Sequence, residues 1–229
     1  MIKDFFKKLV LGKKYSSETY LNYLRSIGIT IGHNVKIIDV RDFIIDTSRP
    51  FLIEIGNDVT FSDHVTIMTH DYSWSIVSRA FPGEIYPIAD KVTIGNNVFI
   101  GTHATILKGV NIGDNSIVGA GSIVTRDVEP NMVYAGSPAK PIMTLEEYKE
   151  KIKAKSESHL RTIIREYRKK NPGKEMDEKY IKEHMAWYKT REEIMNCSNQ
   201  YYTNRRMDSL DREINKFDSI NELINYYSD

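Results

Sequence analysis

A six-residue period governs the front of this chain, and no other feature limits its possible folds so strongly. Counted in blocks of six, the chain places a large apolar residue at every block start, and the fifth place of a block is usually small or β-branched. Glycine or another turn-tolerant residue often occupies the second place. The twelve block starts are Ile31, Ile37, Phe43, Ile55, Phe61, Ile67, Ile94, Ile100, Ile106, Ile112, Val118 and Val124.

A period of six is neither the 3.6 of an α-helix nor the 2 of a half-buried strand. It suits a short strand followed by a bend, repeated so that one apolar side chain per block points to a common axis. If three blocks make one coil, each coil advances the axis by about 4.8 Å, and four to five coils stack to about 20 Å. A β-sandwich would need turn signals every ~8–12 residues with apolar/polar alternation, and that pattern is absent. The period therefore predicts a mainly β, coiled solenoid.

The composition changes near residue 143. Residues 1–143 contain 28 charged residues, 12 of the 13 glycines and six of the seven prolines, whereas the last 86 residues contain 35 charged residues. The front is therefore typical of turns and β-structure, and the back is typical of helices. We expect an N-terminal helical segment at 1–28, a coiled β-domain at 29–143 and a C-terminal α-helical extension at 144–229.

Helix signals organise the C-terminal extension. Thr144 and Glu147 resemble a capping box, and Asn171-Pro172-Gly173 ends the first helix. We expect a second helix from Asp177 to about Asn196 and a third from Ser209 to Tyr226. The basic residues of the first helix fit a solvated face better than a grip on an anionic polymer or lipid, because glutamates interrupt them.

The composition also excludes several classes of function. Lys and Arg total 32 and Asp and Glu total 31, so no net field favours a nucleic acid partner. The single cysteine, Cys197, excludes a disulfide framework and a multi-cysteine zinc cluster, and it indicates a reducing, cytoplasmic location. No apolar run approaches the roughly 20 residues of a membrane span. For the lysine-broken N-terminus, a short helix packed on the domain is favoured over a signal peptide or a membrane-surface contact.

Three longer motifs carry a family resemblance. Residues 94–101 (IGNNVFIG), 119–127 (GAGSIVTRD) and 135–141 (AGSPAKP) are similar to motifs of the hexapeptide-repeat acyltransferases, which fold as left-handed parallel β-helices. The resemblance covers about residues 20–143. It implies a left-handed coil, acetyl-CoA as the co-substrate, no metal, and a homotrimer with active sites between subunits.

The repeat is interrupted by the 73–91 loop, whose sequence cannot continue the blocks of six. Long excursions from a regular scaffold are more often functional than decorative. In the sugar O-acetyltransferases that the chain resembles, a histidine at the base of such a loop is the catalytic base, and His70 matches it. An alcohol that attacks a thioester must lose its proton, and an imidazole with a pKa near 6.5 accepts it at neutral pH.

The residues that follow His70 are further candidates. Asp71 is expected either to hold the His70 ring in the useful tautomer or to cap the turn that opens the loop. Tyr72 and Trp74 are candidates for a platform under a sugar ring, although core packing explains a single Trp equally well.

By matched motif positions, the resemblance implies a cofactor site at Thr102, Ala120, Thr125, Arg126 and Lys140. A narrow pantetheine arm needs small residues such as Ala120, and its phosphates need cations such as Arg126 and Lys140. The chain departs from the family pattern at Phe99, where a tryptophan is frequent, and at Lys108, where a proline is common.

These features together predict an acetyl-CoA-dependent O-acetyltransferase that modifies a sugar hydroxyl. Residues 23–28 resemble the entry segment of surface-polysaccharide acetyltransferases, which favours an acceptor in capsule or lipopolysaccharide assembly. An amino sugar, a serine or an antibiotic remains an alternative acceptor. From other classes, the alternatives are a non-enzymatic β-helix scaffold and a zinc enzyme like the carbonic anhydrases that share the coil; His64 and His70 lie one block apart, which is not that family's ligand spacing.

Overall fold

The computed structural model describes residues 10–182, 184 and 216–228. The chain divides into two compact units, Met1–Lys149 and Glu150–Asp229. Within the described residues, no helix combines the length and the apolar character that crossing a bilayer requires.

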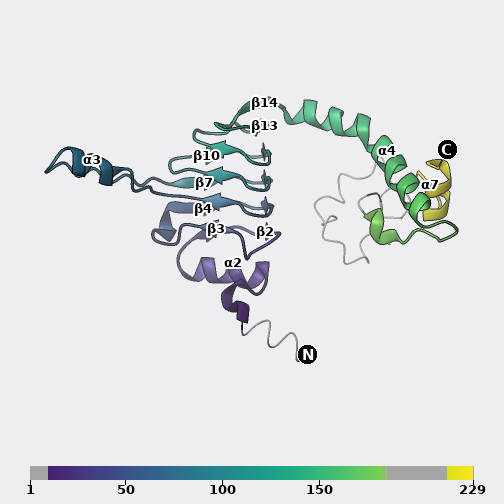
Figure 1. Ribbon diagram of the computed structural model, residues 1–229, viewed down its shortest axis with the longest axis horizontal. Coiled ribbons are helices and arrows are strands. Elements are labelled where there is room, and N and C mark those ends of the chain that lie inside the picture. The colour runs from purple at the N-terminus through teal and green to yellow at the C-terminus, as the bar shows by residue number, and fades with distance from the viewer. Residues whose placement is uncertain (1–9, 183, 185–215, 229) are drawn as a thin grey trace. The chain divides into compact units, whose positions relative to one another are not determined.

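The first unit is a stack of coils, each with one strand in each of three sheets (Figure 1). All pairs between successive coils are parallel. The first sheet contains β1 (Thr30–Ile31), β4 (Ile53–Ile55), β7 (Val92–Ile94) and β10 (Asn111–Ile112). The second contains β2 (Lys36–Ile37), β5 (Thr60–Phe61), β8 (Phe99–Ile100), β11 (Ile117–Val118), β13 (Met132–Ala135) and β14 (Lys140–Thr144). The third contains β3 (Ile44–Ile45), β6 (Thr66–Ile67), β9 (Thr105–Ile106) and β12 (Ile123–Val124).

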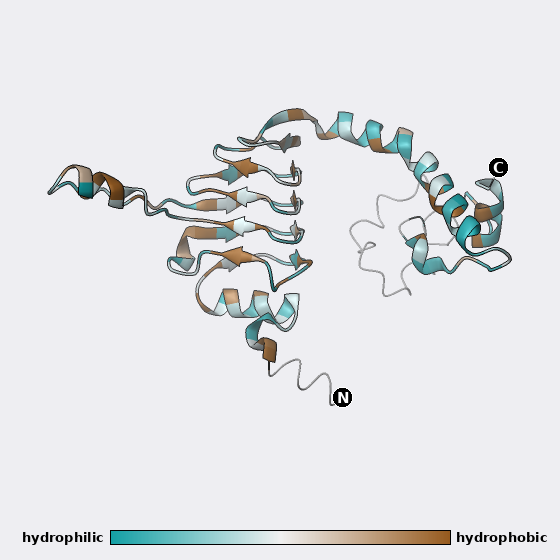
Figure 2. Cartoon of the chain, viewed as in Figure 1, coloured by the Kyte–Doolittle hydropathy of each residue, from teal (hydrophilic) through white to brown (hydrophobic). Residues whose placement is uncertain are grey.

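The register confirms the period of six. Ile94 pairs with Ile112 and Ile100 pairs with Val118, in each case eighteen positions further along the chain. All the expected block starts except Ile31 are buried, and Ile31 packs half-buried against the core. Burial of each fully buried Ile or Phe side chain contributes about 1.5–3 kcal/mol to the free energy of folding. The apolar side chains therefore form the core of the stack, and brown segments recur along its strands in Figure 2.

The expected block start at Phe43 is wrong by two residues. Ile45, not Phe43, pairs with the block start Ile67 of the next coil, so Phe43 occupies a fifth place opposite Val65. The turn before β3 contains two extra residues. Arg41 closes this turn by donating its backbone N–H to Asp39 Oδ1 at 2.9 Å. Both Phe43 and Ile45 are buried, which is why hydrophobicity alone does not separate the two frames.

The bend from the first sheet to the second, which we call the first corner, is held by an asparagine ladder. Asn97, Asn115 and Asn131 have φ of 54°, 56° and 61°. Asparagine is one of the few residues other than glycine that adopt this conformation at low cost. Asn97 Nδ2 donates to Asn115 Oδ1 at 2.9 Å, and Asn115 Nδ2 donates to Asn131 Oδ1 at 3.0 Å.

Both ends of the stack are covered, as a solenoid requires. At the N-terminal end lie η1 (Gly12–Lys14) and α2 (Ser17–Ser26), which buries Tyr20, Leu21 and Leu24. Ser16 caps α2 by accepting a hydrogen bond from the Thr19 N–H at 3.2 Å. At the other end, β14 turns back antiparallel on β13. Of the expected segment 1–28, residues 1–9 lie outside the described residues.

The bends from the second sheet to the third and from the third sheet to the first are the second and third corners. The 73–91 loop leaves the third corner between β6 and β7 and extends away from the stack (Figure 1). An antiparallel bridge between His70 and Ala89 closes its base, and α3 (Trp74–Ala80) forms part of it. The short η2 (Pro50–Leu52) follows the third corner of the preceding coil.

Helix α4 (Leu145–Lys170) runs from β14 into the second unit and ends directly before Asn171-Pro172-Gly173, as expected. Thr144 and Glu147 form the expected capping box: the Glu147 N–H donates to Thr144 Oγ1 at 3.1 Å, and the Thr144 N–H donates to Glu147 Oε2 at 2.7 Å. The second unit has its own core, with Leu160, Ile164, Ile181 and Leu223 fully buried.

The two later helices of the extension differ from expectation. Of the expected helix 177–196, the structure describes 177–182 and 184, where η3 (Glu178–Tyr180) is a short 3-10 turn; the remainder lies outside the described residues. The expected start of the last helix at Ser209 also lies outside them. Residues 216–219 are bends, and α7 (Ile220–Tyr226) begins only after Ser219, whose hydroxyl accepts from the Glu222 N–H at 3.2 Å. This cap explains the late start, because it satisfies a free N–H of the first turn.

Candidate active site

His70 follows β6 at the third corner, where the chain leaves the stack to form the 73–91 loop. Its side chain is 13% exposed. The backbone on both sides is fixed, because the His70–Ala89 bridge and the bond from the Asp90 N–H to the Thr69 carbonyl at 2.9 Å tie the loop's two ends together. The imidazole therefore sits on a rigid scaffold at the base of a long excursion.

Asp46 holds the imidazole from behind. His70 Nδ1 lies 2.5 Å from Asp46 Oδ2, and the Asp46 side chain is only 5% exposed. Oδ1 of the same carboxylate accepts from the Ser48 N–H at 2.9 Å and from the Ser48 hydroxyl at 2.7 Å. The Thr69 hydroxyl donates to Oδ2.

These hydrogen bonds decide the charge of Asp46 and the tautomer of His70. Burial by itself would raise the pKa of the Asp46 carboxyl, but the bonds from Thr69, Ser48 and His70 outweigh it and hold the pKa well below its ordinary value. An ionised carboxylate only accepts, so His70 Nδ1 carries the proton and donates it. The Nε2 of neutral His70 is then free to accept a proton from a substrate, which is the state that a general base needs.

Asp46 is not among the candidate residues that the sequence indicated. The Asp46 N–H donates to the Ile67 carbonyl at 3.0 Å, so Asp46 belongs to the coil stacked directly on the one that carries His70. With a block start at Phe43, Asp46 falls in an unremarkable fourth place. With the block start at Ile45, Asp46 is the first residue of the third corner, which also carries His70. That shared corner is the signal that would have identified Asp46 as a candidate.

Asp71 does not contact the His70 ring. Its Oδ1 accepts from the Ser73 N–H at 2.9 Å, and its Oδ2 accepts from the Lys108 ammonium. The Lys108 bond and then the Ser73 bonds hold the pKa of Asp71 well below its ordinary value. Of the two roles considered for Asp71, the structure forms the turn cap, and the carboxylate that orients His70 is Asp46.

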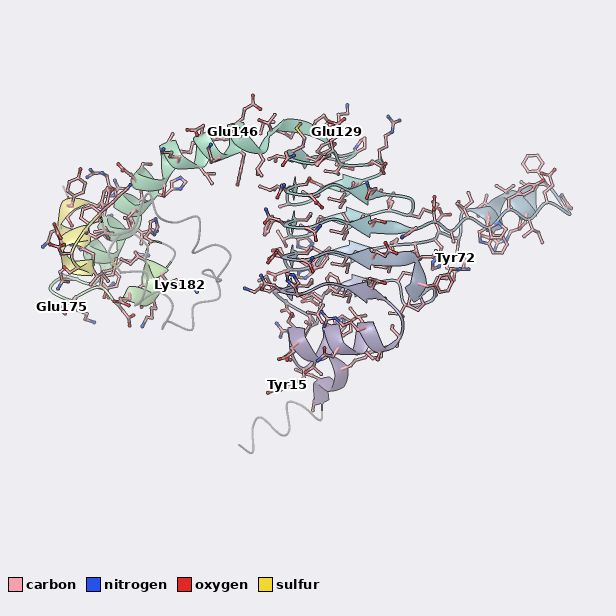
Figure 3. All side chains as sticks on the ribbon, turned by 180° about the vertical axis from the view of Figure 1, so that it is seen from behind. Tyr15, Tyr72, Glu129, Glu146, Glu175 and Lys182 are labelled. Atoms are coloured by element: carbon pink, nitrogen blue, oxygen red, sulfur yellow. The ribbon has the colours of Figure 1, made fainter. Side chains whose placement is uncertain are left out.

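The two aromatic candidates differ in exposure and in their neighbours. The Tyr72 ring is perpendicular to the His70 ring with centroids 5.1 Å apart, and Tyr72 is 70% exposed. Figure 3 shows Tyr72 at the point where the loop leaves the stacked strands. Trp74 begins α3 and is half-buried. Tyr72 is therefore the aromatic surface next to the imidazole.

The expected cofactor residues lie at the two corners that flank the third sheet. Thr102 and Ala120 stack at the second corner, where the Gly121 N–H donates to the Thr102 carbonyl at 2.8 Å. Thr125 and Arg126 follow β12 at the third corner, and both are exposed. The exposed Lys140 begins β14; the neighbouring Ala139 N–H donates to the Ile123 carbonyl of β12 at 2.8 Å.

The remaining histidines of the stack are exposed. The rings of His64 and His103 stack at the second corner with centroids 4.4 Å apart, and His64 Nε2 lies 3.7 Å from Asp42 Oδ2. Across the part of the chain that the structure describes, no three His, Cys, Asp or Glu side chains converge in a way that would hold a metal ion.

The chain is similar to several known proteins. Residues 91–126 match the family model described as hexapeptide repeat of succinyl-transferase. The chain is 42% identical over 151 residues to protein CapG of Staphylococcus aureus, an alignment covering 66% of this chain and 83% of that protein. It is 36% identical over 142 residues to galactoside O-acetyltransferase of Escherichia coli, covering 62% of this chain and 66% of that protein. Among solved structures, it is similar to the hexapeptide-repeat acetyltransferase VCA0836 of Vibrio cholerae, with 21% identity, a TM-score of 0.45, and coverage of 62% of this chain and 89% of that one.

Proposed function

The chain belongs to the hexapeptide-repeat acetyltransferase family, and from that premise we propose that it transfers an acetyl group from acetyl-CoA to a sugar hydroxyl. The single observation that carries the proposal is the buried Asp46–His70 pair at the base of the 73–91 loop. We further propose that the coil is left-handed and that the acceptor belongs to surface-polysaccharide assembly, in keeping with the sequence resemblance. The single cysteine supports a cytoplasmic reaction.

His70 acts as the general base in this proposal. Nε2 takes the proton of the acceptor hydroxyl while that oxygen attacks the thioester carbonyl, and the Asp46 carboxylate stabilises the imidazolium that forms. When the carbon–sulfur bond breaks, His70 returns the proton to the leaving thiolate, so the products are the acetyl ester and free CoA thiol. Acetyl-CoA supplies the activated acyl group. Such general-base help contributes about 10²–10⁴ in rate.

The residues along the third sheet fit the chemistry of a CoA arm. Ala120 leaves room for a narrow chain beside exposed backbone, and Thr102 stacks one coil away. Arg126 and Lys140 are exposed cations available to phosphates. We propose Thr102, Ala120, Thr125, Arg126 and Lys140 as the cofactor contacts.

The proposal of a sugar acceptor rests on two supports. One relative is named as a galactoside O-acetyltransferase. The exposed Tyr72 ring also stands next to His70, and an aromatic face suits the C–H face of a pyranose. We propose Tyr72 and Trp74 as acceptor contacts.

We also propose a homotrimer. The 73–91 loop exposes Phe81 and Ile85, at 58% and 62%, which suits contact with another copy.

The test measures CoA thiol release over a panel of galactosides, glucosides, amino sugars, serine and an aminoglycoside. His70→Asn should lower kcat by about 10²–10⁴ with the fold unchanged by circular dichroism. The matched control is His33→Asn, because His33 is an exposed histidine at the first corner. Transfer only to amines would refute the sugar-hydroxyl acceptor, and normal turnover by His70→Asn would remove His70 from the mechanism.

A further inference from the structure

The second unit contains a cavity of about 530 Å³ that the acetyl-transfer chemistry does not use. Its walls come from the C-terminal part of α4, from residues 171–176 after it, and from α7. Ligand sites in proteins commonly have volumes of about 300–1,000 Å³ and combine an apolar floor with a few polar groups. This cavity is large enough for one or two sugar rings.

Part of the cavity lining is apolar. Ile164 of α4 is fully buried, Ile224 of α7 is 7% exposed, and Met176 packs half-buried against the same core. An apolar patch suits the C–H face of a pyranose ring, which excludes water there without needing hydrogen bonds.

The rim carries amides and two cations. Arg168 and Lys174 are exposed on it, together with the carboxamides of Asn171, Asn221 and Asn225. Carboxamides both donate and accept, as sugar hydroxyls do, and a guanidinium matches the geometry of a carboxylate. The rim thus offers partners for hydroxyl groups and for one negative charge.

Internal hydrogen bonds hold this rim in place. Arg168 donates to Asn225 Oδ1 at 3.3 Å, which links α4 to α7. The Tyr167 hydroxyl donates to the Glu175 carbonyl at 2.7 Å, and Asn171 Nδ2 donates to the Tyr167 carbonyl at 3.1 Å. Glu175, labelled in Figure 3, belongs to the segment after α4. Groups that are ordered before binding lose less entropy when a ligand arrives.

We propose that this cavity binds one or two residues of an acidic sugar chain, with the sugar carboxylate on Arg168 and Lys174 and the ring over Met176 and Ile224. The proposal rests on the proposed function for the choice of a sugar and on the rim for the choice of an acidic one. Glu175 also lines the cavity, so two cations stand against one carboxylate there, and this balance suits a ligand with a single negative charge better than a compact dianion such as phosphate. The second unit then serves to retain the acceptor glycan.

The test is isothermal titration calorimetry of the full chain with digalacturonate, with neutral galactobiose and with inorganic phosphate. Digalacturonate should bind, and Arg168→Gln should weaken that binding about tenfold or more, because a charge-assisted contact is lost. Arg165→Gln removes the same charge from the same helix outside the cavity and should leave binding within about twofold. Lys174→Gln, at an exposed position after α4, gives a second rim variant should Arg168→Gln fail to fold.

Three results would overturn the assignment: no binding of digalacturonate at concentrations up to about 10 mM; equal losses in Arg168→Gln and Arg165→Gln; or phosphate binding as tight as digalacturonate. Binding is also measured in the His70→Asn protein. Acetyl transfer to sugars without digalacturonate binding would refute this inference alone, whereas Arg168-dependent binding without transfer to any sugar would refute the proposed function alone.

Discussion

Replacing Asp46 by Asn should disable His70 through its tautomer. The Ser48 N–H is a fixed donor 2.9 Å from Asp46 Oδ1, so it will hold the amide oxygen of the variant at that place. The NH₂ group then takes the place of Oδ2, which is 2.5 Å from His70 Nδ1. Because the amide nitrogen only donates, Nδ1 must accept, and the ring proton moves to Nε2. An Nε2 that already carries a proton cannot take another from the acceptor hydroxyl.

The size of the effect follows from two contributions. Loss of one hydrogen bond to a charged group costs about 1.5–3 kcal/mol, which corresponds to about 10- to 200-fold in rate. The wrong tautomer adds to this, and the equivalent exchange in a serine-protease triad costs about 10⁴ in kcat. We therefore expect kcat to fall by about 10²–10⁴ in Asp46→Asn. Asp46→Ala should retain more activity, because it removes the charge without forcing the proton onto Nε2.

The assay is acetyl-CoA-dependent thiol release with a saturating galactoside. The KM for acetyl-CoA should stay within about twofold, since Asp46 is buried behind the imidazole and belongs to an earlier coil than the residues proposed for the cofactor. Circular dichroism and urea unfolding establish that each variant is folded. If Asp46→Asn keeps kcat within about threefold of the wild type, or keeps more activity than Asp46→Ala, the argument from the tautomer is refuted.

Three further predictions concern stability. Ile100→Ala, at a fully buried block start, should lower the free energy of unfolding in urea by about 2–5 kcal/mol, whereas Ile44→Ala, at a side chain 56% exposed, should change it by less than about 1 kcal/mol. Gly101→Ala should cost about 1–3 kcal/mol by the same measurement, because its Cβ would lie 2.6 Å from the Ala120 nitrogen; an unchanged urea midpoint would contradict that contact. The folded-state pKa of Asp46 is depressed, so its ionised form contributes stability above the unfolded pKa of about 3.9 and loses it as the pH falls toward the folded value. The unfolding free-energy difference between wild type and Asp46→Asn should therefore shrink from pH 6 to pH 3, and a constant difference would count against the ionised pair.

Much of the first unit can be predicted from the sequence alone, because the repeat that forms each coil is visible within a few residues. Apolar residues spaced by six positions can all be buried only if they point toward a shared axis. The neighbouring coils then cover them above and below. The interruption at the 73–91 loop is equally visible, since its sequence offers no block starts, and His70 is marked by its position at the loop's base. The frame error at Phe43 arose because two buried residues, Phe43 and Ile45, satisfy the same hydrophobic criterion.

The second unit was less predictable. The end of α4 has strong local signals in Asn171-Pro172-Gly173, and the capping box at Thr144 marks its beginning. The start of α7 depends on which serine caps it. More than one serine precedes apolar residues in this region, so the sequence does not single out the cap. The choice of Ser219 is made by packing of Leu223 and Ile224 against α4 residues such as Leu160, and that contact is not encoded locally.

The sequence by itself determined the coil and the position of the loop, because each of these depends on neighbours within a few positions along the chain; His70 as the candidate base came from the family resemblance. Only the tertiary structure decided which carboxylate serves that imidazole. Asp71 is adjacent to His70 but turns to Ser73 and Lys108, whereas Asp46, 24 residues earlier, reaches the ring. The physical reason is the stacking of coils, which brings residues from successive turns within hydrogen-bond distance while adjacent side chains along a bend point apart.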